Sequence, residues 1–273
     1  MEYFELNNGI KVPALGFGTY QISKRNTEEN VSQALNLGYR SIDTAQNYGN
    51  ESEVGSAVNK SGIQREKIFI TSKTQTSGYK NTKARIDASL QAAKLDYFDL
   101  MIIHWPNGND IETYHALEDA YKEGKLRAIG LSNFNSEQTQ QIIDHATVMP
   151  AVNQIETHIY WQQKKMHQFL NAKNILHESW APLGEGATDI LKNPTLQKIA
   201  SSHKKSIAQV ILRFLTQSGI MVIPKSTNVD HIESNLDIFD FKLTESELLS
   251  IQQLDQKHSA SGWPSTMRTE ANY

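Results

Sequence analysis

Three ionisable side chains each stand where a short apolar segment of this sequence ends. These residues are Asp43, Lys73 and His104, and Tyr48 lies in the polar loop just after Asp43. A phenol with its usual pKa of about 10 is a poor acid near neutral pH, but a nearby ammonium favours the phenolate. Lys73 can supply that ammonium, and Asp43 would keep it charged and in place. We therefore expect Tyr48 to be an acid with a lowered pKa, with His104 beside it.

Each of these residues alone has a simpler explanation. A single tyrosine such as Tyr48 is most often a packing or surface residue, and a lone His104 is more often a hydrogen-bonded core histidine. Asp43 and Lys73 on their own could equally form a structural ion pair. The joint pattern favours chemistry, because three ionisable groups end three successive apolar segments with a phenol beside them.

Apolar, strand-like segments alternate with helix-periodic segments along most of the chain. The expected strands are 15–18, 41–43, 68–72, 100–103, 128–131, 152–155, 175–180 and 220–223. Eight strands that alternate with helices predict an α/β fold, a closed (β/α)8 TIM barrel. An open doubly wound sheet is the alternative, but Gly16 and Gly18 are followed by Gln21 and not by the third glycine of a G-x-G-x-x-G motif.

Additional elements are expected besides the eight strands and the helices that follow them. Segments 4–6 and 10–12 flank Asn7-Asn8-Gly9, which predicts an N-terminal β-hairpin that could plug the barrel floor. Two extra helices are expected, one around residues 196–200 and one from about residue 244. No interdomain linker interrupts the pattern, so we expect a single domain over residues 1–273.

Helix starts can also be predicted from capping residues. Thr27 precedes two acidic residues and is a plausible N-cap of the first helix. Asn50 would cap the second helix, with Glu53 as its capping-box partner. Because functional groups of a barrel lie at the carboxyl ends of its strands, the pattern selects Asp43, Lys73, His104, Asn133, Gln154, Trp180 and Lys225.

Composition narrows the class of function. The 273 residues carry a net charge of -3, and the pI is near 6.3, which argues against a nucleic-acid or anionic-membrane surface. The absence of cysteine excludes disulfides and thiol chemistry. The N-terminus has no signal-peptide pattern, and no apolar run approaches the roughly 20 residues that cross a bilayer. We expect a cytoplasmic protein with no metal, and a monomer because no segment demands a partner chain.

Further motifs extend over nearly the whole chain. They are Gly16-Phe-Gly-Thr19, Arg40-Ser-Ile-Asp-Thr-Ala-Gln-Asn-Tyr-Gly49-Asn-Glu51, Ile70-Thr-Ser-Lys73, His104-Trp-Pro106, Gly124-Lys-Leu-Arg-Ala-Ile-Gly-Leu-Ser-Asn-Phe134, Asn153-Gln-Ile-Glu156, Ala181-Pro-Leu-Gly184 and Ile223-Pro-Lys-Ser226. Together these motifs resemble the aldo-keto reductase family. The short loops are similar to the compact microbial members that include the diketogluconate reductases.

The resemblance implies NAD(P)H-dependent reduction of a carbonyl to an alcohol, with hydride from the nicotinamide. It implies that Tyr48 donates the proton to the carbonyl oxygen, that Asp43 and Lys73 tune it, and that His104 orients the substrate. The implied cofactor contacts are Thr19, Ser132, Asn133, Gln154, Trp180, Pro182, Leu183, Lys225, Ser226, Thr227, His231 and Asn235. The implied substrate pocket contains Tyr20, Trp105 and Trp263, and Trp180 stands where many relatives carry a stacking tyrosine.

The residues that would bind the adenosine end of the cofactor depart from the family pattern. Relatives that prefer NADPH usually carry an arginine six residues after the lysine that matches Lys225, and here that residue is His231. Ser234 stands in place of the glutamate that usually precedes the matching Asn235. A histidine is mostly neutral at pH 7, so NADPH should be preferred over NADH less strongly than in those relatives. NADPH affinity should rise as pH falls through about 6.5, where a histidine gains its charge.

Two other functions remain open at this point. A Schiff-base aldolase would use Lys73 on the same barrel and need no nicotinamide. A non-catalytic accessory protein on the same fold would need neither chemistry. Loss of reduced-nicotinamide absorbance on adding an aldehyde would favour the reductase, which would act on a small-molecule carbonyl.

Overall fold

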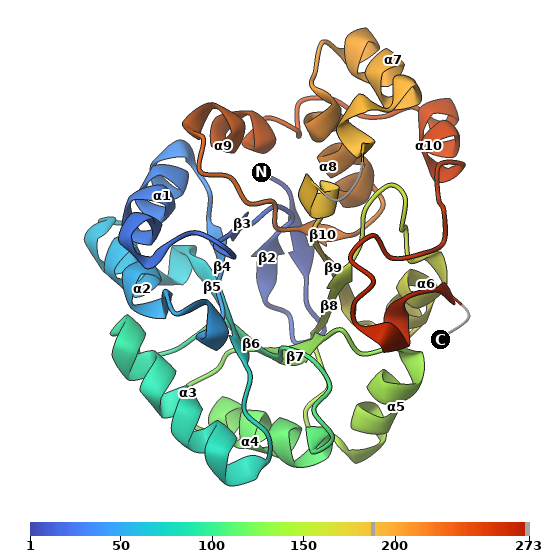
Figure 1. The fold of residues 1–273 in the computed structure, drawn as a ribbon. Helices are drawn as coiled ribbons and strands as arrows, with labels where there is room; N and C mark the ends of the chain where they lie inside the picture. The colour runs from blue at the N-terminus through green and yellow to red at the C-terminus, as the bar shows by residue number, and fades with distance from the viewer. Residues whose placement is uncertain (187–188, 271–273) are drawn as a thin grey trace.

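Eight short strands form one parallel sheet in the part of the chain that the computed structural model describes, residues 1–186 and 189–270. The strands pair in chain order from β3 to β10 and curve around a common centre (Figure 1). Their bounds are β3 Phe17–Gly18, β4 Ser41–Asp43, β5 Phe69–Thr74, β6 Leu100–Ile103, β7 Ile129–Ser132, β8 Val152–Glu156, β9 Leu176–Trp180 and β10 Met221–Val222.

The sheet closes into a barrel where its last strand meets the backbone of its first. Leu15, just before β3, forms a parallel bridge with Val222 of β10, and the Gly16 N–H donates to the Val222 carbonyl at 2.8 Å. A Cβ on Gly18 would lie 2.9 Å from the carbonyl oxygen of Ile223. Glycine therefore allows the first and last strands to approach this closely. The predicted (β/α)8 barrel is confirmed.

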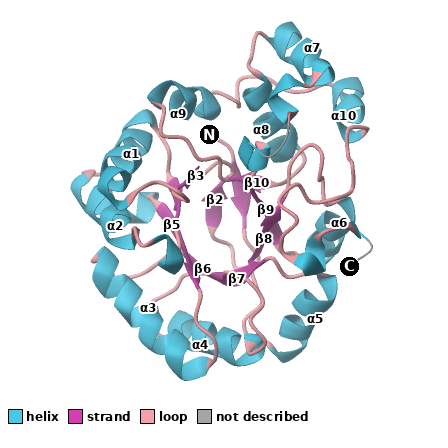
Figure 2. Cartoon of the chain, in the orientation of Figure 1, coloured by secondary structure: helices cyan, strands magenta, loops and turns pink. Residues whose placement is uncertain are grey.

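Ten α-helices occur in the described residues and surround the strands (Figure 2). Their bounds are α1 Lys24–Leu37, α2 Glu51–Lys60, α3 Tyr79–Ala93, α4 Asp110–Lys122, α5 Ser136–His145, α6 Lys164–Ala172, α7 Pro194–His203, α8 Ile207–Gln217, α9 Val229–Leu236 and α10 Glu245–Gln252. The two predicted extra helices are α7 and α10, which pack against each other at one side of the ring (Figure 1).

The N-terminal hairpin covers one end of the barrel. Strands β1 (Tyr3–Glu5) and β2 (Lys11–Pro13) pair antiparallel, within one residue of the predicted bounds. Leu6 and Val12 belong to a buried cluster with Leu100 and Val152 of the barrel strands. The hairpin therefore closes the floor with apolar side chains, as predicted, and the carboxyl ends of the strands form the opposite, open end.

Two predicted helix caps are wrong in detail. Helix α1 begins directly after Ser23, so Thr27 lies inside its first turn and donates its hydroxyl to the Ser23 carbonyl at 3.0 Å. Helix α2 does begin after Asn50, but the Asn50 side chain makes no capping hydrogen bond. Its Oδ1 accepts from the Thr44 hydroxyl at 2.7 Å, and its Nδ2 donates to the Thr19 carbonyl at 3.2 Å. Asn50 thus ties together the loops that follow β3 and β4.

Candidate active site

Asp43 and Lys73 form a buried ion pair at the carboxyl ends of neighbouring strands. Strands β4 and β5 pair in parallel, and the exposed fractions of Asp43 and Lys73 are 2% and 0%. The Lys73 Nζ donates to the Asp43 carboxylate, to the Thr44 carbonyl at 3.0 Å and to the Tyr48 hydroxyl at 3.3 Å. Burial alone would lower the pKa of Lys73, but the charges of Asp43 and Tyr48 raise it above its ordinary value. The amine therefore stays charged.

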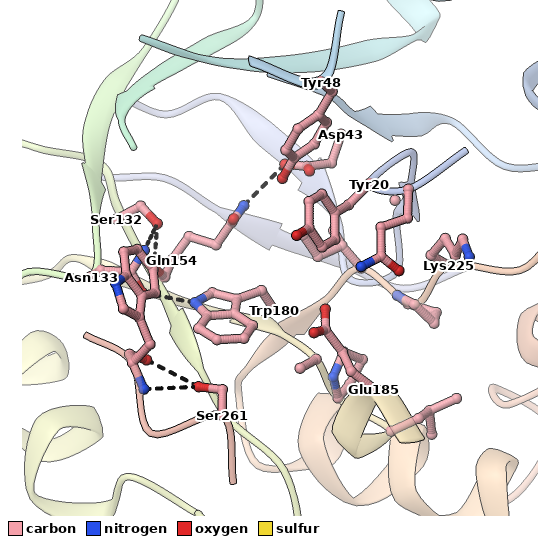
Figure 3. Close-up of a pocket in the computed structure, with 18 of the residues that line it drawn as sticks. Tyr20, Asp43, Tyr48, Ser132, Asn133, Gln154, Trp180, Glu185, Lys225 and Ser261 are labelled. Atoms are coloured by element: carbon pink, nitrogen blue, oxygen red, sulfur yellow. Dashed lines mark hydrogen bonds between the residues drawn. The ribbon is translucent and has the colours of Figure 1, made fainter. Parts of the chain in front are cut away.

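Tyr48 is held by a single 3-10 turn, Gln46–Tyr48, that follows β4 and ends at Gly49 in the left-handed region, with φ 69°. Its ring lies beside Asp43 at the wall of the cavity (Figure 3). Burial raises the pKa of Tyr48 to about 12, and the charge of Lys73 offsets only part of that increase. The prediction of a lowered pKa is wrong for this structure, because the loss of solvation outweighs the neighbouring ammonium.

His104 follows β6 and faces the phenol. The ring centroids of Tyr48 and His104 are 5.7 Å apart, with an interplanar angle of 72°. Burial, followed by the positive charge of Lys73, lowers the pKa of His104 to about 2, so the imidazole is neutral at any ordinary pH. Its Nδ1 has no hydrogen-bond partner among the described residues. A neutral imidazole can donate one N–H and accept at its other nitrogen.

Hydrogen-bonded side chains from β7, β8 and β9 form the next part of the cavity wall (Figure 3). Gln154 Nε2 donates to Asp43 Oδ2 at 3.0 Å, and the Ser132 hydroxyl donates to the Gln154 carbonyl at 2.8 Å. Asn133 Oδ1 accepts from Trp180 Nε1 at 2.9 Å. These bonds fix the polar groups in one orientation and hold the Trp180 indole at the wall.

A cavity of about 620 Å³ extends from Tyr48 to the loop after β10. This volume lies in the range typical of small-molecule sites. The predicted site residues that line the cavity are Tyr20, Asp43, Tyr48, His104, Trp105, Ser132, Asn133, Gln154, Trp180, Pro182, Leu183, Lys225 and Trp263. The structure therefore brings together most of the positions selected from the sequence.

The other predicted residues lie outside the cavity lining. Lys73 is completely buried and contacts the cavity lining through Asp43 and Tyr48. Thr19 is also buried, and its hydroxyl donates to the Asp43 carbonyl at 2.9 Å, so it supports the site from behind. The remaining four lie in the loop after β10 and on α9: Ser226, Thr227, His231 and Asn235.

Aromatic rings form the mouth of the cavity. Tyr20 lies 5.0 Å from Tyr48, and Trp105 lies 4.2 Å from His104, measured between ring centroids. Trp263 meets Trp105 edge to face, with centroids 5.2 Å apart and an interplanar angle of 89°. The predicted substrate-pocket residues thus form an apolar wall beside the phenol and the imidazole.

Comparison with known proteins identifies the chain. The model of the aldo/keto reductase family matches residues 14–256. The glyoxal reductase of Bacillus subtilis is 42% identical over 256 residues, which cover 92% of each chain. An aldo/keto reductase from Brucella melitensis has a TM-score of 0.90 at 42% identity and covers 93% of this chain and 99% of its own. The chain belongs to the aldo/keto reductase family.

A complex in the same family carries a nicotinamide cofactor. An aldo-keto reductase of Bombyx mori, in complex with NADP, has a TM-score of 0.90 at 30% identity and covers 95% of this chain and 94% of its own. The family match and the reductase relatives make this protein an oxidoreductase enzyme. Within its described residues, this aldo/keto reductase has no helix suited to crossing a bilayer and no group of residues suited to holding a metal ion.

Sequence reasoning missed two buried carboxylates of the reductase. Glu156 binds the C-terminal tail, and it stands at the end of a quoted motif, Asn153–Glu156. Glu178 is completely buried beside the ion pair, and its only signal was its position as a charged residue inside an expected strand, 175–180. Further cavity-lining residues that were not predicted are Gly18, Gln21, Asn47, Ala181, Glu185, Gly186, Leu191, Ile223, Pro224 and Ser261.

Parts of two segments near the site lie outside the described residues. In the polar loop after β9, Glu185 lines the cavity, while residues 187–188 are not described. In the C-terminal tail, Trp263 lines the cavity as expected, whereas Tyr273 falls in the undescribed residues 271–273.

Proposed function

We propose that this enzyme uses NADPH to reduce aldehyde or ketone carbonyls to alcohols, with Tyr48 as the proton donor. The observation that carries the proposal is the buried Lys73 ammonium 3.3 Å from the Tyr48 hydroxyl, which itself faces the cavity. A cation at this distance stabilises the phenolate that remains after proton transfer. The neighbouring Asp43 keeps the cation charged.

The residues of the cavity fit a nicotinamide cofactor. Gln154, Ser132 and Asn133 offer amide and hydroxyl groups for its carboxamide. Asn133 donates to the Ser132 hydroxyl, Ser132 donates to the backbone carbonyl of Gln154, and the Gln154 amide donates to Asp43, which holds these groups in place. The indole of Trp180, fixed by its bond to Asn133, presents a ring on which the nicotinamide can stack. A nicotinamide cofactor held by these residues would supply hydride to the carbonyl carbon.

The proton is delivered by the chain itself. As the carbonyl is reduced, negative charge develops on its oxygen, and Tyr48 donates its hydroxyl proton to that oxygen. His104 is neutral, so its N–H can orient the oxygen without competing as a stronger acid. Lys73 then holds the phenolate of Tyr48 until a solvent proton restores it.

The residues expected at the adenosine end of the cofactor support a preference for NADPH over NADH. Lys225 lines the cavity, and α9 begins just beyond it with Asn228 as its N-cap, whose Oδ1 accepts from the backbone N–H of Asp230 at 2.9 Å and of His231 at 3.3 Å. A lysine and a helix N-terminus both favour a phosphate group. His231 in place of a guanidinium leaves room for some use of NADH.

The substrate class that we propose is small aldehydes and α-dicarbonyls. The relative from Bacillus subtilis is named for glyoxal reduction and is 42% identical. The aromatic wall of Tyr20, Trp105 and Trp263 offers few charged partners to a larger polar substrate.

A Schiff-base aldolase is disfavoured by the state of Lys73. An aldolase lysine must attack the substrate as a neutral amine, whereas Lys73 has a raised pKa and three hydrogen-bond acceptors. Its exposed fraction of 0% also keeps a carbonyl carbon from reaching Nζ.

The deciding experiment is Tyr48→Phe, with NADPH oxidation measured in the presence of glyoxal. We expect NADPH binding, followed by quenching of tryptophan fluorescence, to stay within about threefold, and kcat to fall by about 10²- to 10⁴-fold, as is typical for loss of a general acid. Tyr160→Phe is a matched control, since Tyr160 is buried and donates to Asp189 at 3.2 Å. Near-normal turnover by Tyr48→Phe would exclude Tyr48 as the acid.

A further inference from the structure

Glu178 is a completely buried carboxyl group without a structural partner. It lies at the centre of β9 with an exposed fraction of 0%, and neither Oε1 nor Oε2 has a hydrogen-bond partner among the described residues. Buried carboxylates are normally paired or hydrogen-bonded, because an unpaired buried charge is strongly unfavourable. Glu178 therefore contributes no structural bond that would explain its presence.

The strand register places Glu178 on the barrel interior, under the active site. Side chains alternate along a strand, so Glu178 faces the same side as Trp180, which lines the cavity two residues further on. Its partner in register on β8 is Gln154, whose amide reaches Asp43 at 3.0 Å. On β10 its partner is Met221, which is apolar and buried.

The charged groups that face Glu178 are those of the catalytic ion pair. Burial, followed by the negative charge of Asp43, raises the pKa of Glu178 to about 8, and the charge of Lys73 and the amide of Gln154 offset part of that increase. Glu178 therefore holds a proton at neutral pH. Above pH 8, a second carboxylate joins Asp43 in attracting the single positive charge of Lys73.

We propose that Glu178 is a positioning residue that acts through Lys73 and controls how strongly that ammonium stabilises the phenolate of Tyr48. While Glu178 is protonated, the charge of Lys73 is balanced by Asp43 alone and supports the phenolate. When Glu178 releases its proton to solvent, the added negative charge in the barrel interior opposes phenolate formation and slows carbonyl reduction. This inference rests on the proposed role of Tyr48 as the proton donor.

The first test compares the pH profile of single-turnover NADPH oxidation in the parent enzyme and in Glu178→Gln, with glyoxal as the substrate. Glutamine keeps the size of the side chain and stays neutral. We expect equal rates within about twofold at pH 6.5. At pH 9, one unit above the pKa, about nine-tenths of Glu178 is ionised, so the parent should lose up to about tenfold in rate. The variant should retain most of its rate, and superimposable profiles would overturn the proposal.

A matched control separates this effect from general loss of a buried acid. Glu51 is also a buried carboxyl group with a raised pKa, but its oxygens accept from Ser72 at 2.6 Å and from Ser89 at 3.1 Å. Glu51→Gln should leave the shape of the pH profile unchanged. An equal flattening in both variants would overturn a specific role for Glu178.

A spectroscopic measurement does not depend on activity. With glutamate labelled by ¹³C, the infrared spectrum of the parent minus that of Glu178→Gln should contain the carbonyl stretch of a protonated carboxyl group at pH 7, and this band should disappear as pH rises through 8. Absence of the band at pH 7 would overturn the proposal. If the band is present but Tyr48→Phe still turns over, the proposed function fails and this inference fails with it. If Tyr48→Phe is inactive but the pH profiles of the parent and Glu178→Gln superimpose, only this inference is overturned.

Discussion

The Nζ of Lys73 lies 3.3 Å from the hydroxyl oxygen of Tyr48, and both side chains come from loops and strand ends that Asn50 and Thr19 help to fix. The ammonium has three N–H donors, and each has an acceptor: the Asp43 carboxylate, the Thr44 carbonyl at 3.0 Å and the phenol. Nζ therefore has one position, and the phenolate would form directly against a fixed positive charge.

Removal of that charge should abolish turnover without loss of cofactor binding. Replacement of Lys73 by methionine alone would leave Asp43 buried and unpaired, which is strongly destabilising. The double variant Asp43→Asn/Lys73→Met removes both charges, and we expect its kcat for glyoxal reduction to fall by at least about 100-fold. NADPH binding, measured by fluorescence titration, should change little.

A matched control for this double variant exists on the surface. Lys83 pairs with Glu123, and both residues are partly exposed. Glu123→Gln/Lys83→Met removes a similar ion pair and should leave kcat within about twofold, because exposed pairs contribute little. A double variant of Asp43 and Lys73 that kept more than a tenth of the parent rate would contradict the electrostatic role given to Lys73.

The neutral state of His104 makes the enzyme less stable in acid. Burial lowers the pKa of His104 to about 2, below the value of about 6.5 in an unfolded chain. Between these values the unfolded state binds more protons, so the stability present above pH 6.5 is lost as pH falls. From pH 7 to pH 5 this single group should lower the free energy of unfolding by about 2 kcal/mol.

The contribution of His104 can be isolated with His104→Gln, which removes the titrating ring. Urea unfolding of parent and variant at pH 7 and at pH 5 should give a difference in free energy that shrinks by about 2 kcal/mol at the lower pH. His145→Gln, at an exposed position on α5, is the control for replacement of an imidazole as such. If the difference in unfolding free energy between the parent and His104→Gln did not change with pH, burial would not be what keeps His104 neutral.

The barrel and the end that carries the candidate site followed from the sequence because strand ends carry strong local signals. Asp43, Lys73 and His104 each interrupt an apolar run, and parallel strands place such interruptions at one end of the barrel. Helix caps were less predictable. Thr27 and Asn50 have ordinary capping side chains, but both use their polar atoms for other backbone or side-chain partners, and only tertiary structure determines that choice.

The sign of the Tyr48 pKa shift could not be derived from the sequence either. Adjacency to a lysine predicts a lowered value, whereas the structure gives a raised one because burial is the larger effect. Glu178 likewise looks like a charged residue in a half-exposed strand until the register on β8 and β10 shows both of its neighbours to be buried. Burial depends on the closed barrel, which no local pattern contains.

Cofactor preference should respond to His231→Arg. A guanidinium at the start of α9 would add one charged hydrogen bond to a 2′-phosphate, which is worth about 1.5 to 3 kcal/mol, or roughly 10- to 100-fold in affinity. We expect the Kd for NADPH to fall by that factor at pH 8 and the Kd for NADH to stay unchanged. In the parent, NADPH binding should tighten as pH falls from 8 to 5.5, and this dependence should vanish in the variant.

Two results would argue against a role of His231 in cofactor preference. One is a parent Kd for NADPH that is flat over this pH range while His231→Arg leaves it unaltered. The other is an equal increase in the affinities for NADPH and NADH as pH falls, since only NADPH carries the 2′-phosphate. His258→Arg provides a control at an exposed histidine in the C-terminal tail, which is bonded to the Ser259 carbonyl at 3.2 Å.

Glu156 should control substrate affinity through the C-terminal tail. Its carboxylate accepts from the backbone N–H of Ala260 at 2.9 Å and from the hydroxyls of Ser259 and Ser261 at 2.5 and 2.6 Å. The same segment continues to Trp263, part of the aromatic wall. In Glu156→Gln, the side-chain NH₂ group would face the N–H and O–H donors of the tail and could accept no hydrogen bond from them. The tail should therefore be held less firmly. We expect KM for glyoxal to rise by about tenfold, the loss of a hydrogen bond to a charged group, with NADPH affinity unchanged.

A double-mutant cycle tests whether this effect passes through Trp263. If Glu156 acts by placing the Trp263 indole against Trp105, then Glu156→Gln should raise KM in the parent but have little further effect in Trp263→Ala, where the indole is already absent. If Glu156 and Trp263 instead affected substrate binding independently, the changes in log KM of the two single variants would add in the double variant. Limited proteolysis offers a second readout, since Glu156→Gln should expose the chain near Ser261 to cleavage while the barrel stays intact. Additive KM changes together with an unaltered cleavage pattern would mean that the bonds from Glu156 to the tail do not shape the substrate pocket.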